Sequence, residues 1–244
     1  MINQIHRLNR NVIIFQQAFA RLNGLIIETF LEFHRINVKG VKKMKNFQRV
    51  MWHFMIMWAV TAVGMLVGTL LPPSVLLPIS FITLFLLIIV IFIRSIRVLN
   101  TILYCIPFLI GITLFWSTQF YIEQLGSALV FAVFIGTVVI FISLGFIGIM
   151  MKDLSAFGSY LFGALIVLLV FGLIFIFVPV SNTIMLVLAC LTVLVFALYT
   201  IYDFNQIKHN YVGENEIVGM ALNLYLDFVN IFLRLLEIIW RVKD

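Results

Sequence analysis

The chain has 244 residues, of which 64% are hydrophobic and 11% charged, with a mean hydropathy of +1.17 and a formal net charge of +6. A soluble domain of this length needs far more polar surface, so the composition excludes an ordinary soluble enzyme and predicts an all-α, polytopic membrane protein. The excess positive charge lies mostly near the N-terminus. It suits an anionic inner leaflet and is by itself no evidence of nucleic-acid binding.

Residues 1–48 form a basic region ahead of the first long apolar stretch. An apolar stripe with nearly heptad spacing runs through residues 5–36. This stripe could lie in the membrane interface, pair with another chain or belong to a loosely ordered basic tail. We therefore divide the chain into a cytoplasmic or interfacial region, residues 1–48, and a membrane domain, residues 49–244.

Six apolar stretches in the membrane domain are long enough to cross the hydrocarbon core. They are about Val50–Leu71, Val75–Ile93, Thr101–Tyr121, Ser127–Met151, Gly158–Val178 and Thr183–Tyr202. A seventh, about Ile217–Trp240, is apolar but carries several polar side chains. Because the connections are short, neighbouring helices should be antiparallel, which predicts a bundle of seven transmembrane helices. Cys105 and Cys190 fall in apolar stretches and are predicted to be small core residues.

Lysine and arginine are unevenly distributed among the predicted loops. The loops after the second, fourth and sixth spans carry Arg94, Arg97, Lys152 and Lys208. The loops after the first, third and fifth spans carry none, so the positive-inside rule predicts a cytoplasmic N-terminus in the cell membrane. Seven full spans place the C-terminus outside, where Arg241 and Lys243 depart from the rule. A re-entrant seventh segment would restore it.

Two aspartates occur in apolar sequence near the C-terminal end. Asp203 closes the run Ala189–Tyr202, and Asp227 lies within Ala221–Trp240. Carboxylates at membrane depth are costly and usually mark an ion path, a proton relay or a catalytic pair. A helical hairpin centred near Asn215 would bring both to similar depth, and two close carboxylates cannot both ionise freely. The pattern predicts a proton-sharing pair that senses pH or takes up a cation.

The last predicted helix carries a polar stripe around the second of these aspartates. The stripe consists of Asn223, Asp227, Asn230, Arg234 and Glu237, spaced by four, three, four and three residues. This spacing places all five on one helical face, which predicts a central helix facing a polar interior. The alternative is a satisfied structural network in which Arg234 pairs with Asp227 or Glu237.

Further polar side chains are expected near Asp203. Tyr199 and Tyr202 precede it on the sixth predicted span. Arg94 ends the second span and should lie at the same cytoplasmic level, where a salt bridge to Asp203 could close the interior. The alternative for Arg94 is an ordinary snorkelling side chain at the membrane surface.

Several segments resemble the Bax inhibitor-1 family, most closely its bacterial members. They are Tyr202–His209, Ala221–Leu233, Gly111–Leu114 and Lys152–Ser155. The resemblance extends from about Arg49 to Arg241. It implies a seven-helix fold in which six helices surround the last.

The same resemblance implies a pH-sensitive calcium leak. In the family, two aspartates that match Asp203 and Asp227 share a proton, and an arginine that matches Arg94 latches the closed state. The chain departs from the family pattern at Thr83, where some bacterial members carry glutamate, and at Arg234 and Glu237.

These observations leave three functions open. The first is a leak in which Asp203 and Asp227 bind Ca²⁺ weakly and transiently, without a cofactor or enzymatic activity, because hard cations prefer oxygen ligands. The second is a di-aspartyl protease, disfavoured because Leu224–Asp227 lacks the Gly-x-Gly-Asp motif. The third is an interaction protein in which residues 1–48 contact a membrane-bound protease or act in a stress or cell-death response.

Overall fold

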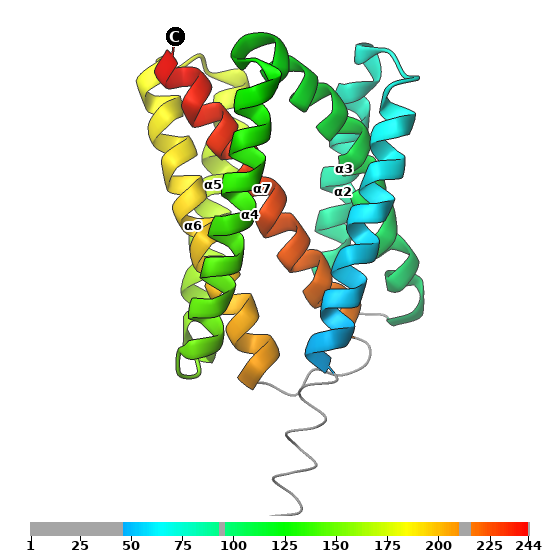
Figure 1. Cartoon of the computed structure of the whole chain (residues 1–244), viewed down its shortest axis with the longest axis vertical. Coiled ribbons are helices and arrows are strands. Elements are labelled where there is room, and N and C mark those ends of the chain that lie inside the picture. The colour runs from blue at the N-terminus through cyan, green and yellow to red at the C-terminus, as the bar shows by residue number, and fades with distance from the viewer. Residues whose placement is uncertain (1–45, 93–95, 210–215, 244) are drawn as a thin grey trace, which may run out of the picture. The chain divides into compact units, whose positions relative to one another are not determined.

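The computed structural model describes residues 46–92, 96–209 and 216–243, and the regular elements within these ranges are all helical (Figure 1). They are a first helix (Asn46–Gly68), α2 (Leu76–Phe92), α3 (Ile96–Leu125), α4 (Ser127–Met150), α5 (Gly158–Phe177), α6 (Asn182–His209) and α7 (Ile217–Lys243), with short 3₁₀ turns at Pro73–Val75 and Ser155–Phe157. The predicted amphipathic stripe of residues 5–36 lies outside the described residues.

Five of the described helices are long and apolar enough to cross a membrane: the first helix, α3, α4, α5 and α6. A shorter apolar helix covers Pro73–Ile89. α7 is not among them. Five of its residues are charged: Asp227, Arg234, Glu237, Arg241 and Lys243. The chain is therefore a multi-pass helical membrane protein, and the number of exactly seven spans stays a prediction.

Large apolar side chains cover much of the outside of the bundle. Examples on α4 and α5 are Phe131, Phe146, Tyr160 and Phe177, each more than half exposed. In a membrane protein this surface faces acyl chains, which are as apolar as the core. The prediction that Cys105 and Cys190 are core residues is wrong, since both are exposed. An apolar neighbourhood in the sequence does not distinguish a core-facing from a lipid-facing position.

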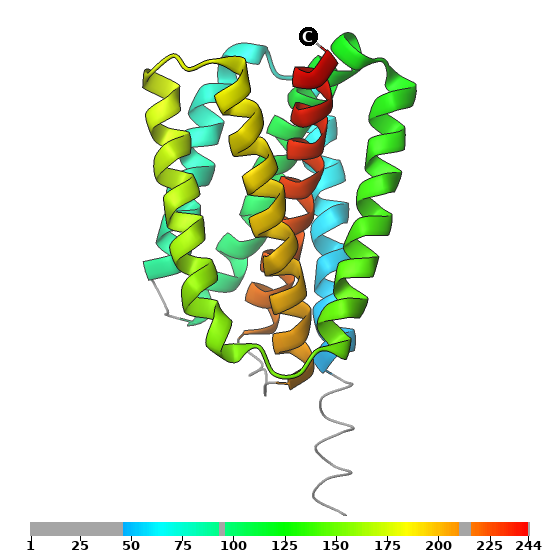
Figure 2. The same ribbon diagram turned by 90° about the vertical axis from the view of Figure 1, so that its left-hand side faces the viewer.

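α7 is the most polar of these helices, yet about half of its residues are buried. It packs against α3, α4 and α6. It also meets the first helix, where the ring of Trp58 lies 5.4 Å from that of Tyr225 and 5.0 Å from that of Phe228. Figures 1 and 2 show α7 passing obliquely among the other helices. The apolar residues of α7 thus contribute the largest share of the buried core.

The N-terminal end of the first helix and the C-terminal ends of α4 and α6 lie together. Phe47 and Phe204 are in ring contact at 6.4 Å, and Lys208 donates a hydrogen bond to the carbonyl of Ile149. The start of α6 and the end of α7 meet instead at Asn182 and Arg241. The predicted cytoplasmic residues Lys152 and Lys208 therefore share one end of the bundle; the side of the membrane that it faces stays a prediction.

Glycine allows two helices to approach closely near the bundle centre. A Cβ added to Gly64 of the first helix would lie 2.2 Å from the carbonyl oxygen of Phe108, and one added to Gly111 of α3 would lie 2.3 Å from that of Thr61. Such distances exclude any side chain without movement of the backbone. At this contact Thr61 Oγ1 lies 2.7 Å from Tyr225 Oη, which ties α7 to the same helix pair.

Candidate functional site

The two predicted carboxylates are both buried. Asp203 lies six residues before the end of α6 and is 7% exposed, whereas Asp227 lies near the middle of α7 and is 4% exposed. Among α2 to α7, the helices α6 and α7 make the most extensive contact with one another. The helical pair thus carries both carboxylates into the interior, as predicted. The residues of the predicted turn near Asn215 lie outside the described ranges.

Asp203 and Asp227 lie close enough to interact electrostatically. The hydroxyl of Tyr199, one turn before Asp203, lies close enough to both carboxylates to interact with them electrostatically. The hydroxyl of buried Thr200 lies within hydrogen-bonding reach of Asp227 and 2.9 Å from the carbonyl oxygen of Phe196. Each aspartate nevertheless has a buried Oδ2 without a hydrogen-bond partner among the described residues. A buried carboxylate oxygen without a hydrogen-bond partner is costly, which makes this pair the candidate site.

Asn205, two residues after Asp203, fixes the end of α6 to the loop that follows α4. Its Nδ2 donates to the carbonyl oxygens of Gly148 at 3.0 Å and Lys152 at 2.9 Å, and its Oδ1 accepts from the backbone N–H of Leu154 at 2.8 Å. Asn205 is completely buried. It therefore satisfies backbone groups at the C-terminal end of α4 that have no partner within that helix. The sequence did not reveal this role, because no motif links Asn205 to the end of α4.

Aromatic rings form a wall beside the carboxylate pair. Phe204 and Phe228 each follow one of the two aspartates in the sequence, and the ring of Phe141 on α4 lies 5.5 Å from the first and 5.4 Å from the second. These are edge-on contacts of the kind that stabilise aromatic pairs beyond the area they bury. The wall holds α4, α6 and α7 together at the level of the site.

The polar stripe of α7 is divided between different environments. Asn223 is exposed, and Asn230 donates from its Nδ2 to the carbonyl oxygen of Leu226 on the same helix at 2.8 Å. Arg234 pairs with Glu237, the second of the two partners considered for it. Asp227, in the N-terminal half of the stripe, thus lies toward α6. Arg234 and Glu237, in its C-terminal half, form an ion pair.

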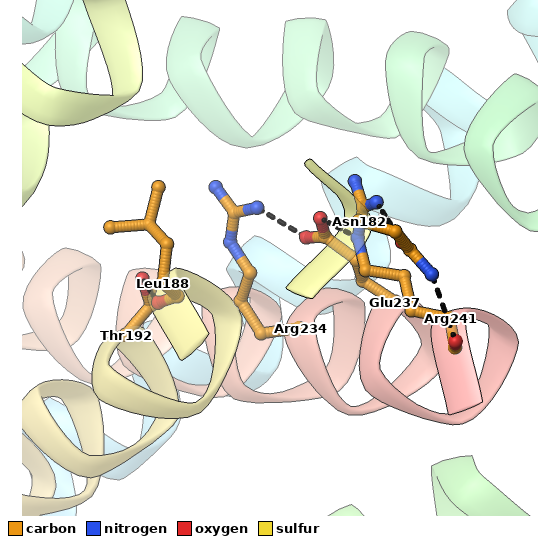
Figure 3. A network of polar contacts seen from close by, with 6 residues as sticks. All are labelled: Asn182, Leu188, Thr192, Arg234, Glu237 and Arg241. Carbon is orange, nitrogen blue, oxygen red and sulfur yellow. Dashed lines mark hydrogen bonds and ion pairs between the residues drawn. The ribbon is translucent and has the colours of Figure 1, made fainter. Parts of the chain in front are cut away.

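Figure 3 shows this network at the C-terminal end of α7. Glu237, 7% exposed, accepts hydrogen bonds from Arg234 and from Nε of Arg241, the latter at 2.9 Å. Arg241 also donates to Asn182 Oδ1 at 2.8 Å, and Asn182 Nδ2 donates to the Arg241 carbonyl oxygen at 3.2 Å. The network fastens the end of α7 to the start of α6, at the opposite end of α6 from Asp203.

Other predicted site residues have less definite positions. Tyr202 is half-buried, and its hydroxyl lies against Gly158 at the start of α5. Arg94 lies outside the described residues, so its salt bridge with Asp203 stays a prediction. The described residues contain no group of three or more His, Cys, Asp or Glu side chains that could hold a metal ion. A cation at this site would thus have the two carboxylates as its only acidic ligands among them.

The fold and the buried pair define a multi-pass helical membrane protein with acidic side chains in its interior. Residues 43–243 match the family described as "Inhibitor of apoptosis-promoting Bax1". Because this match covers most of the chain, the protein belongs to the Bax inhibitor-1 family, as the C-terminal segments predicted.

Individual relatives are found in plants and bacteria. The chain is 42% identical over 86 residues to the protein LIFEGUARD 4 of Arabidopsis thaliana. The aligned region covers 35% of this chain and 34% of that protein. It is 34% identical over 133 residues to an uncharacterized membrane protein of Streptococcus pyogenes serotype M3, covering 52% of this chain and 58% of that protein. The chain thus spans about a third of the length of the Arabidopsis relative and little more than half of the streptococcal one.

Proposed function

We propose that this protein is a pH-sensitive leak for Ca²⁺ in the cell membrane, and that the ion passes between Asp203 and Asp227. The observation that carries the proposal is the burial of both carboxylates on the paired helices α6 and α7, each with an oxygen that has no hydrogen-bond partner within the part of the chain that the structure describes. Acidic side chains at membrane depth are costly, and ion paths are among the functions that retain them. Family membership is consistent with a role in the membrane.

The proposed mechanism couples the ion to the proton shared by the pair. Loss of the proton leaves negative charge that attracts a cation, whereas protonation removes this charge and favours closure. Tightly bound Ca²⁺ takes about six to eight oxygen ligands. Two carboxylates therefore make a weak site from which the ion can leave. The flux should therefore rise as the pH rises and fall as the pH falls.

The proposed architecture has seven transmembrane helices with α7 in the middle and the N-terminus in the cytoplasm. The extensive packing of α7 supports its central place. The latch at the cytoplasmic end is the proposed salt bridge between Arg94 and Asp203, which would hold the interior closed. Arg94 is placed in this role by the predicted topology and by the family resemblance.

The test is Ca²⁺ uptake into liposomes that contain the purified full-length protein, followed with an enclosed indicator dye over a series of pH values. Protein-free liposomes give the baseline. The wild type should carry a flux that increases with pH, and Asp227→Asn should lower it. Glu123→Gln is the matched control, because it neutralises an exposed carboxylate on α3. Flux equal to the baseline at every pH would contradict the proposal.

The family description favours a second candidate, since it names inhibition of an apoptosis-promoting protein. In this alternative the chain is an interaction protein that modulates a membrane-bound protease or a cell-death response, with residues 1–48 as the contact region. Deletion of residues 1–45 separates the two candidates. The leak should survive this deletion, whereas binding of a protein partner through this region should be lost.

A further inference from the structure

A groove of ≈ 540 Å³ lies between the first helix and α4. Met51, Phe54 and Trp58 line it from the first helix, and α4 lines it from Phe134 to Ile149. The rings of Phe204 and Phe228 close it on the side of α6 and α7. Every lining residue is apolar or glycine, so the groove offers no side chain that would hold an ion or a well-ordered water molecule.

The length of the groove suits an extended acyl chain. From Phe134 to Ile149 it follows α4 for about 22 Å at the rise of an α-helix. An acyl chain that reaches through one leaflet crosses about half of the ~30 Å hydrocarbon core, so it fits within this length.

The mouth of the groove is continuous with the surface that faces lipid. Ile142 and Phe146 line the groove and are also 64% and 63% exposed. Both lie on α4, a helix of membrane-spanning length and composition. The molecules next to this opening in a bilayer are therefore lipid tails, for which entry costs no desolvation of polar groups.

Basic residues lie at one end of the groove. Lys152 follows α4 just beyond Ile149, and Lys208 donates a hydrogen bond to the carbonyl oxygen of Ile149 itself. Both lysines are exposed. Their ammonium groups can attract the phosphate of a lipid whose tail occupies the groove. Apolar shape and positive charge thus match the two parts of a phospholipid.

We propose that the groove between the first helix and α4 binds one acyl chain of a membrane phospholipid, with the lipid phosphate near Lys152 and Lys208. The bound chain would touch Phe204 and Phe228, the residues that follow the two aspartates. Lipid binding would thereby limit the movement of α6 and α7 around the carboxylate pair. This last consequence rests on the proposed leak, whereas the binding site itself does not.

Trp58 provides a reporter inside the groove. In a variant that keeps Trp58 as its single tryptophan, Trp52, Trp116 and Trp240 are replaced by phenylalanine. The indole nitrogens of Trp116 and Trp240 have no hydrogen-bond partner among the described residues, so these two replacements break no such bond there. The full-length protein is reconstituted in phosphatidylcholine and phosphatidylglycerol whose acyl chains carry bromine, which quenches nearby indole fluorescence. The groove should bring bromine next to Trp58 and quench it.

Two pairs of substitutions test whether the quenching comes from the groove. Val138→Phe and Met51→Phe fill it, while Val139→Phe and Met55→Phe add the same ring at neighbouring positions that are 59% and 55% exposed. Each filling variant should lower the quenching of Trp58 by about half, because the added ring takes the space of the acyl chain. Each control should leave it unchanged.

A variant with Trp52 as the single tryptophan monitors ordinary lipid contact, because Trp52 is 61% exposed. Its quenching should be the same in all four substituted proteins. The two filling positions lie on different helices, so a folding defect in one variant leaves the other pair to decide. An unquenched Trp58, or equal quenching in the filling variants and their controls, would overturn the acyl-chain site whether or not the protein carries Ca²⁺.

Discussion

Asn205 donates a hydrogen bond from Nδ2 to the carbonyl oxygen of Lys152 at 2.9 Å, and this contact closes the junction between α6 and the loop after α4. The same amide also bonds Gly148, Met151 and Leu154, so one side chain bonds four backbone groups. Because Asp203 lies two residues earlier on the same helix, the position of the carboxylate pair depends on this junction.

Asn205→Ala should therefore destabilise the protein. It leaves several buried backbone groups without partners, at a cost of about 2–4 kcal/mol in the free energy of unfolding. Asn223→Ala is the control, because Asn223 is exposed on α7, and it should change stability by less than about 0.5 kcal/mol. Loss of helical circular dichroism with denaturant in detergent measures both. Equal stability of the two variants would refute the proposed role of Asn205.

The contact between the first helix and α3 predicts that Gly111 tolerates no larger residue. Gly111→Ala places a methyl group 2.3 Å from the carbonyl oxygen of Thr61 and should lower stability by about 1–3 kcal/mol. Gly163→Ala on α5 meets no atom within 4 Å and should be neutral or stabilising by up to about 1 kcal/mol, since alanine favours a helix. Thermal unfolding in detergent compares the two, and similar midpoints would argue against this close packing.

The ion-pair network at the end of α7 predicts unequal effects of its members. Glu237→Gln removes the charge between two guanidinium groups and should destabilise by about 1–3 kcal/mol, because its side chain is only 10% exposed and its partners lose a charged acceptor. Arg234→Gln should cost less than about 1 kcal/mol, since its side chain is 39% exposed and screened by solvent. Denaturant unfolding that ranks these two variants in the opposite order would contradict the network.

The proposed latch predicts a gain of function. Arg94→Ala should raise basal Ca²⁺ flux and flatten its pH dependence, because the salt bridge to ionised Asp203 can no longer form. Asp203→Asn should act in the same direction, since an amide holds a guanidinium less tightly than a carboxylate does. Arg97→Ala, in the same segment, is the control and should behave like the wild type. Liposome flux measures all three, and an unchanged Arg94 variant would exclude the latch.

Much of the fold follows from the sequence because helices in a membrane need continuous apolar stretches. The predicted span Ser127–Met151 and helix α4 differ by a single residue. Helix ends were less predictable: α6 continues past Tyr202 to His209, and Asn205 bonds the backbone at the C-terminal end of α4. Composition marks where a helix crosses the bilayer but not the contacts that its ends make.

The side of each helix that faces inward was harder to predict. Lipid tails and protein core are equally apolar, so hydropathy did not show that α5 lies on the outside or that Cys105 is exposed. Polar side chains were better guides, since Asp203 and Asp227 are buried as expected. Asn223 belongs to the same predicted stripe of α7 as Asp227 but is exposed, although the neighbouring Leu222 and Leu224 are buried.

The central claim is that Asp203 and Asp227 act as one proton-sharing unit that controls Ca²⁺ flux. The most direct measurement is the pH dependence of flux in liposomes for the wild type, Asp203→Asn, Asp227→Asn and the double variant. The double variant has neither titrating carboxylate and should lose the pH dependence of the wild type, whereas each single variant keeps one carboxylate and should show a changed pH dependence. A double variant with the pH dependence of the wild type, or the same pH-independent flux in all four proteins, would contradict the account.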